Sequence, residues 1–148
     1  MCGIAGLINF DPSDQAENSG KVLRNMLDAL RHRGPDDRGE ERIEVANGPT
    51  LHLGHQRFSI IDLTQAGHQP MANDDESVWV STNSEIYNYK ELRNELAGKF
   101  QFHSESDTEV LLRATKTGAS NVWINFWACS RSPSGTARKK RYSLPVIV

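Results

Sequence analysis

Hydrophobic residues recur along the first part of the chain with a spacing that changes from strand-like to helical. Residues 3–10 form a short apolar run that ends at turn-forming residues, which predicts a buried strand. Apolar residues at helical spacing follow over residues 22–30, which predicts an amphipathic helix that ends near His32, before Gly34 and Pro35. The chain is therefore expected to begin with a strand followed by a helix.

Residues 43–63 return to a strand-like pattern. Leu51 and Leu53 alternate with His52, and a second apolar run occupies residues 58–61. This pattern predicts strand structure around residues 51–53 and again at residues 58–61.

The remaining patterned segments are shorter. Residues 78–80 predict a strand, residues 87–96 a helix and residues 100–103 extended chain. A further helix is expected after Ser106, with Glu109 placed to complete a capping box. Because strands and helices are grouped rather than strictly alternating, the pattern predicts an α+β fold with separate layers of sheet and helix.

The composition is that of an ordinary globular domain. The chain has 148 residues, of which 37% are hydrophobic and 24% charged. No apolar stretch is long enough for a membrane span and no signal peptide is present, so we expect a cytoplasmic protein without membrane association. The two cysteines, Cys2 and Cys129, make neither a disulfide framework nor a metal motif, and the histidines lack ligand spacing, so no metal site is predicted.

The charge distribution breaks sharply near residue 109. Residues 1–109 carry 19 acidic against 10 basic residues, whereas residues 110–148 carry seven basic residues and no acidic one. The basic run at residues 138–141 alone would be compatible with a nucleic-acid or membrane patch.

Cys2 follows the initiator methionine directly and is a candidate nucleophile. Removal of Met1 would leave the thiol and a free α-amine, with a pKa of about 7.7–8.0, on the same residue. The thiolate is the reactive form of cysteine, and this amine could accept the thiol proton. Taken alone, Cys2 leaves an alternative open: this cysteine has no function and merely happens to follow the initiator methionine.

Four further segments concentrate polar and turn-forming residues. They are residues 31–37 (RHRGPDD), 53–63 (LGHQRFSIIDL), 83–89 (NSEIYNY) and 104–109 (SESDTE). Each is weak alone, but in this order behind Cys2 they resemble the N-terminal glutaminase domain of asparagine synthetases, which are class II glutamine amidotransferases. The resemblance covers about residues 1–113.

The resemblance implies a fold and a reaction. The fold would be the α-β-β-α sandwich of the N-terminal nucleophile (Ntn) hydrolases. Cys2 would attack the side-chain amide of glutamine, form a thioester, release ammonia for transfer to aspartate and yield glutamate on hydrolysis. The side chain of Asn83 and the backbone N–H of Ser84 would form the oxyanion hole, whose donors are each worth about 10²–10³ in rate.

The same resemblance implies which residues bind glutamine. Arg57 would hold the substrate carboxylate, which suits its two-pronged donor geometry. Glu85 and Asp107 would hold the α-ammonium group, together with backbone groups near Ile60 and Ile61. Glutamine is thus the expected partner, no nucleic acid or membrane is expected, and the oligomeric state stays open.

Two features concern what this sequence lacks relative to the family. No glycine-rich phosphate loop is present, so we expect no cofactor here; ATP and magnesium would belong to a synthetase domain that the sequence does not contain. The family usually has glycine at position 84, where this chain has Ser84. Glycine tolerates a positive φ and close approach to a ligand better than serine does, so the backbone conformation of Ser84 decides whether the oxyanion hole is preserved.

The resemblance stops abruptly near Ala114. With free third bases chosen to favour the match, codons compatible with residues 122–148 spell LDKLLGM, FAFTLWDR and KEKTLFLARDR when read one base out of phase. These strings resemble the segments with which the family continues. We therefore predict an incomplete, truncated glutamine amidotransferase domain over residues 1–114 and an out-of-frame tail over residues 115–148, which the nucleotide sequence would test.

This prediction leaves alternatives to an active glutaminase. Losing several buried apolar side chains at about 2–5 kcal/mol each would exceed a typical stability of about 5–15 kcal/mol, so the chain could be an inactive remnant of a frameshifted gene. A class II amidotransferase with another ammonia acceptor is a second alternative. A nucleic-acid-binding module is a third, and it depends only on the charge of the tail.

Overall fold

The chain forms short strands and helices whose bounds match most of the sequence pattern. The structure, a computed structural model, describes residues 1–11, 16–46 and 48–117. Its elements in chain order are β1 (Gly3–Asn9), α1 (Ala16–Leu30), the 3₁₀-helix η1 (Arg31–Arg33), β2 (Asp37–Glu44), β3 (Thr50–Arg57), the 3₁₀-helix η2 (Gln65–Gly67), β4 (Met71–Ala72), β5 (Trp79–Val80), α2 (Tyr89–Leu96) and α3 (Asp107–Lys116).

Strand β3 is the centre of a three-stranded antiparallel sheet with the order β1-β3-β2. Successive side chains of a strand point to opposite faces, and β3 divides its residues accordingly. Gln56 donates from Nε2 to the Leu27 carbonyl of α1 at 3.0 Å, and Leu27 fills the space next to Gly54. His55, between them in sequence, hydrogen-bonds Ser81 beyond β5 on the other side. The even-numbered residues thus face α1, and His55 faces the second layer.

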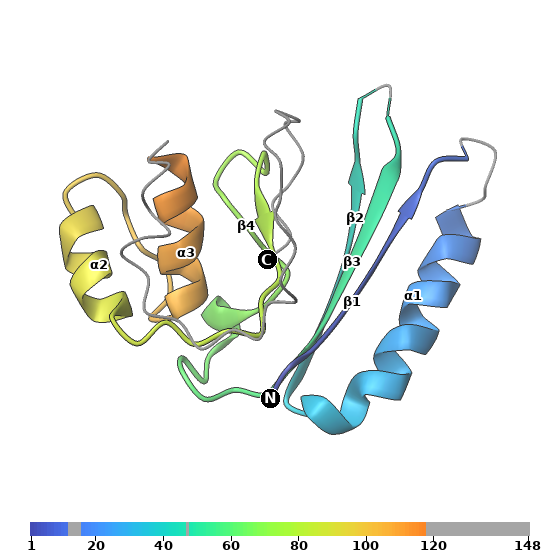
Figure 1. The fold of residues 1–148 in the computed structure, drawn as a ribbon, viewed down its shortest axis with the longest axis horizontal. Helices are drawn as coiled ribbons and strands as arrows, with labels where there is room; N and C mark the ends of the chain where they lie inside the picture. The colour runs from blue at the N-terminus through green and yellow to red at the C-terminus, as the bar shows by residue number, and fades with distance from the viewer. Residues whose placement is uncertain (12–15, 47, 118–148) are drawn as a thin grey trace, which may run out of the picture.

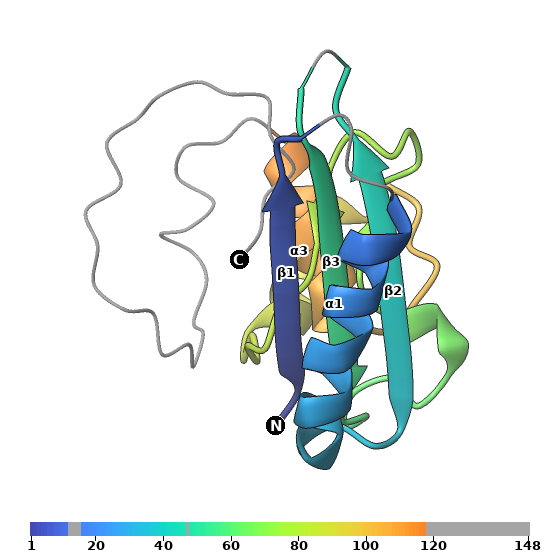
Figure 2. The same ribbon diagram turned by 90° about the vertical axis from the view of Figure 1, so that its right-hand side faces the viewer.

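The elements are arranged in layers. Figure 1 shows α1 against one face of the three-stranded sheet, with β4 and then α3 and α2 on the other side. Figure 2 views the molecule from the α1 side and shows the helix in front of the sheet, between β1 and β2. Strands β4 and β5 form a separate antiparallel pair. Within the described residues the fold is therefore mixed, with two small sheets between helices.

Buried apolar side chains gather in two regions of the fold. On the α1 side, Leu23 and Leu27 are buried, as their helical spacing predicts. The other layer has its own hydrophobic cluster, which joins strand, loop and helix residues: Val80, Ile86, Leu92, Val110, Leu111 and Leu112. The loops that connect these two regions are therefore anchored at both ends by packed apolar side chains.

Several predicted elements are confirmed. The expected strand at residues 3–10 is β1, and the expected strand at 78–80 contains β5. The helices expected at 22–30 and 87–96 correspond to α1, which begins earlier, and α2. Helix α3 follows Ser106 as expected and continues past Ala114.

Two expectations about local structure are wrong. Residues 58–61 form a loop rather than a strand, with Phe58 and Ile60 exposed. Ser106 does cap α3, accepting from the Thr108 N–H at 3.0 Å, but the capping box is absent. The Glu109 carboxylate instead accepts from backbone N–H groups of the preceding loop, at residues 103 and 104.

Most of the predicted out-of-frame tail, including Cys129 and the basic run at residues 138–141, lies outside the described residues. In the part of the chain that is described, no helix has the length and hydrophobicity needed to cross a membrane.

Candidate active site

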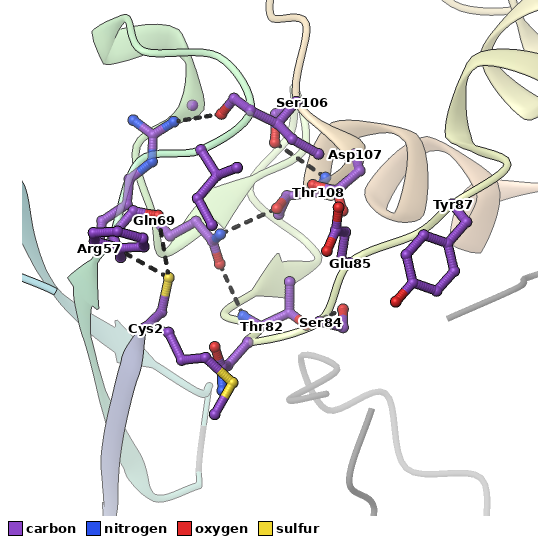
Figure 3. Close-up of a pocket in the computed structure, with 16 residues that line it drawn as sticks. Cys2, Arg57, Gln69, Thr82, Ser84, Glu85, Tyr87, Ser106, Asp107 and Thr108 are labelled. Carbon is purple, nitrogen blue, oxygen red and sulfur yellow. Dashed lines mark hydrogen bonds between the residues drawn. The ribbon is translucent and has the colours of Figure 1, made fainter. Parts of the chain in front are cut away.

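All the site residues predicted from the sequence line one pocket of about 180 Å³. Figure 3 shows Cys2 at this pocket, with Arg57 on one side and Glu85 and Asp107 on the other. The predicted residues that line it are Cys2, Arg57, Ile60, Ile61, Asn83, Ser84, Glu85 and Asp107. Drug-sized ligands usually occupy pockets of about 300–1,000 Å³, so this volume suits a smaller molecule such as a single amino acid.

The thiol of Cys2 is directed into the pocket by its place before β1. Gly3 faces α1, where an added Cβ would lie 2.9 Å from Leu30 Cβ, so Cys2 faces the opposite side of the sheet. Its Sγ accepts a hydrogen bond from the Phe58 N–H at 3.3 Å, and its carbonyl accepts one from Arg33 Nε at 3.0 Å. The residue is therefore fixed through both its backbone and its sulfur.

Arg57 ends β3 and shapes the loop that follows it. Its buried guanidinium donates from Nη1 to the Thr64 carbonyl at 2.9 Å and from Nη2 to the Ile61 carbonyl at 3.2 Å, with a further bond to the Asp62 carbonyl. The guanidinium also fills the space beside Gly67, where any Cβ would collide with it. Arg57 thus places a positive charge at the pocket and holds the residue 58–67 loop around itself.

Asp62 fastens the same loop to the N-terminus of α3. Its backbone has a φ of 53°, and its carboxylate accepts from the Thr64 N–H at 3.0 Å and the Glu105 N–H at 2.8 Å. Desolvation acts to raise the pKa of Asp62, but the bonds from Thr64 and Glu105 outweigh it and lower the pKa. The Asp62 carboxylate therefore stays charged and joins two walls of the pocket.

Glu85 and Asp107 supply the acidic side of the pocket. Asp107 is the first residue of α3 and is buried, and its Oδ2 accepts from the Ile86 N–H at 2.9 Å. Burial raises the pKa of Asp107, and the negative charge of Glu85 raises it further. A cation bound between the two carboxylates would offset their mutual repulsion and stabilise the charged form of Asp107. With Arg57 on the other side, the charges complement a molecule that carries both an ammonium and a carboxylate.

The loop that follows β5 carries the predicted oxyanion residues, and Gln69 supports it. The Thr82 N–H donates to Gln69 Oε1 at 2.8 Å, and Gln69 Nε2 donates to Thr108 Oγ1 at 3.0 Å. Gln69 is buried and lines the pocket. Sequence reasoning missed Gln69 because a glutamine before a proline carries no signal of its own; only the fold brings it against Thr82.

Ser84 occupies the position where the resembling family usually has glycine. In the described part of the chain, the non-glycine residues with positive φ are Asp62 and Glu76, so Ser84 keeps a backbone conformation that any L-residue adopts. Its hydroxyl lies 2.7 Å from Thr82 Oγ1. Serine is therefore accommodated here without backbone strain and adds a bond that glycine would lack.

The described residues contain no group of three or more His, Cys, Asp or Glu side chains placed to hold a metal ion. The chemistry available in the pocket is that of a thiol, two carboxylates, a guanidinium and amide or backbone donors.

Comparison with known proteins gives a consistent result. Residues 1–124 match the family described as "Glutamine amidotransferase domain". Asparagine synthetase [glutamine-hydrolyzing] 1 of Bacillus subtilis is 42% identical over 113 residues, covering 76% of this chain and 17% of the relative. An asparagine synthetase [glutamine-hydrolyzing] of Brassica oleracea is 40% identical over 111 residues, covering 75% of this chain and 17% of the relative.

A relative with a different name matches the same region. Amidase chyE of Penicillium rubens is 36% identical over 124 residues, covering 78% of this chain and 18% of the relative. This chain therefore spans less than a fifth of the length of each of these three relatives.

Proposed function

The chain belongs to the glutamine amidotransferase domain family, and its similarity is to the glutaminase part of asparagine synthetases; from this premise we propose that its pocket hydrolyses glutamine to glutamate and ammonia. The observation that carries the proposal is the position of Cys2 in one pocket with Arg57, Glu85 and Asp107. The proposed architecture is the Ntn-type α-β-β-α sandwich. Its support is the order of α1, the three-stranded sheet, β4 and the pair α2 and α3 in Figure 1.

In the proposed complex, opposite charges orient the substrate. Arg57 binds the α-carboxylate of glutamine, while Glu85 and Asp107 bind the α-ammonium group. Backbone groups near Ile60 and Ile61 complete the binding of this end of the substrate. The side-chain amide then extends toward Cys2, which converts a bimolecular attack into a reaction between groups held in place.

The proposed chemistry needs Cys2 as the first residue. Met1 is 76% exposed and so accessible to an aminopeptidase. The freed α-amine accepts the thiol proton, and Sγ attacks the amide carbon of glutamine. Asn83 and the Ser84 N–H donate to the oxyanion, and the C–N bond breaks as the amine returns its proton to the leaving ammonia. Water then hydrolyses the thioester, releasing glutamate and restoring the thiol.

The ammonia acceptor depends on parts of a longer protein or on a partner. We propose aspartate, because relatives at 40–42% identity are named asparagine synthetases. The similarity to Amidase chyE supports a second candidate, a class II amidotransferase with another acceptor. An experiment that separates the two mixes this chain with the synthetase region of the Bacillus relative and with glutamine labelled with ¹⁵N in its amide. Appearance of ¹⁵N in asparagine supports aspartate as the acceptor.

The test of glutamine hydrolysis uses the full chain after its mass has shown that Met1 is removed. We expect formation of glutamate and ammonia from glutamine, and a covalent adduct at Cys2 with an electrophilic glutamine analogue. Cys2→Ala should abolish both, whereas Cys129→Ser should change neither. A processed chain that forms no glutamate and no adduct would refute the proposal and favour the inactive-remnant alternative.

A further inference from the structure

The two halves of the proposed reaction centre belong to different sheets. Cys2 precedes β1 in the three-stranded sheet, whereas Asn83 and Ser84 follow β5 in the two-stranded sheet. A small shift of one sheet against the other would change the distance between the attacking sulfur and the oxyanion donors. Misplacement by about 1 Å can cost about 100-fold in rate. A direct bond between the sheets near this point would therefore matter for catalysis.

His55 makes such a bond. It lies on the central strand β3, two residues before Arg57, and its side chain is completely buried. Its Nδ1 lies 3.1 Å from the hydroxyl of Ser81, which is also completely buried and directly precedes Thr82. The bond thus links the strand paired with β1 to the first residue after β5.

The two nitrogens of His55 have different surroundings. Nδ1 has Ser81 as its partner, while Nε2 is buried and meets no partner among the described residues. A buried polar atom without a partner costs about 1–3 kcal/mol, which an apolar side chain would avoid. The structure therefore retains an imidazole at this site despite a cost, and the bond that the imidazole does make is the one to Ser81.

We propose that His55 is a positioning residue, which through Ser81 holds the residue 82–84 loop at the distance from Cys2 that catalysis requires. The inference rests on the proposed glutamine hydrolysis. His55 and Gln69 support this loop from different sides. Gln69 holds Thr82 to α3, on the same side as the loop itself, whereas His55 holds the loop to the sheet that carries the nucleophile.

The charged groups around His55 favour a neutral ring. Burial lowers its pKa first, Arg57 and His68 lower it further, and Asp37 opposes them, with a resulting value of about 4. At neutral pH the ring therefore carries one proton. Together with the Ser81 hydroxyl, which acts as donor or acceptor, it forms one neutral bond.

The test compares substitutions that keep or lose a polar atom at the Nδ1 position. His55→Asn places its amide near Nδ1, whereas His55→Gln places its amide near Nε2. Ser81→Ala removes the partner and leaves the ring. Leu23→Val, in α1 on the far face of the sheet, is the control for a general loss of stability. Each variant is made in the full chain with Met1 removed.

We expect His55→Gln and Ser81→Ala to lower kcat for glutamine hydrolysis about 100-fold with little change in KM, because the groups that bind the substrate are untouched. His55→Asn should restore most of kcat. Hydrogen exchange, followed by mass spectrometry over residues 82–84, should be faster in His55→Gln and Ser81→Ala than in the parent, His55→Asn or Leu23→Val.

The exchange measurement decides the inference even without activity. Suppose that the parent hydrolyses no glutamine, but that the residue 82–84 loop exchanges faster in His55→Gln and Ser81→Ala than in the other proteins. The proposed function then fails, and His55 still positions the loop. Unchanged exchange and kcat in His55→Gln would overturn the inference. So would an equal loss in His55→Asn or in Leu23→Val.

Discussion

Acidification should destabilise this protein through one buried ring, that of His55. Its pKa falls from 6.5 to about 4, chiefly because of burial and then because of Arg57. The unfolded chain therefore takes up a proton at His55 near pH 6.5, whereas the folded chain does so only near pH 4. Unfolding thus binds a proton between these two values, and the folded state loses stability as the pH falls through this window.

The size of the effect follows from the shift. The fall of the His55 pKa from 6.5 to about 4 corresponds to about 3 kcal/mol once the pH is below both values. At pH 4.5 most of this should already be lost. Asp107 acts in the opposite direction, because its raised pKa adds stability as the pH falls. Asp62 and Glu109, whose pKa values are lowered, act in the same direction as His55, so the loss measured for the parent combines several groups and the contribution of His55 needs a variant to isolate it.

Urea unfolding of the full chain at pH 7.5 and pH 4.5, followed by tryptophan fluorescence, measures this loss. His55→Asn removes the titrating ring, so its free energy of unfolding should fall by about 2–3 kcal/mol less than that of the parent over the same interval. The comparison within each protein cancels the cost of the substitution itself. Equal pH dependence in parent and variant would show that the reasoning about His55 is wrong.

Three further predictions follow from single contacts. Gly67→Ala puts a methyl group where the Arg57 guanidinium lies, so KM for glutamine should rise about tenfold or more in steady-state assays. This rise corresponds to the loss of one charged hydrogen bond, which is worth about 1.5–3 kcal/mol. An unchanged KM would contradict this prediction. Glu109→Gln removes one charged hydrogen-bond partner of the buried Arg113, which keeps Asp74, and urea unfolding should show a loss of about 1.5–3 kcal/mol. Ser84→Gly removes a hydroxyl bond and adds backbone freedom, so the free energy of unfolding should fall by about 1 kcal/mol, whereas a gain would mean that serine strains the loop.

The sequence was most informative about residues whose role depends on their own chemistry. Cys2, Arg57 and Asp107 could be selected because a thiol, a guanidinium and a carboxylate stood within recognisable motifs, and the structure brings all three to one pocket. Helices α1 and α2 could be predicted because their apolar stripes bury against a neighbouring layer.

Residues whose role depends on distant partners could not be predicted. Gln69 and the pair of His55 and Ser81 become supports of the site only when segments far apart in sequence meet. The apolar run at residues 58–61 looked like a strand because local pattern cannot show that Arg57 binds the carbonyls beyond it and holds this segment as a loop.

The hydrogen bonds of Arg57 and Asp62 order the wall of the pocket before any ligand binds. Because Arg57 holds the residue 58–67 loop to β3 and Asp62 holds it to the start of α3, the conformational entropy of this loop is lost during folding. Binding then requires little further ordering, so a small, flexible amino acid meets a preorganised surface. Glutamine should accordingly associate rapidly and with a modest entropic penalty, and mutations that loosen either set of hydrogen bonds should slow association before they unfold the protein.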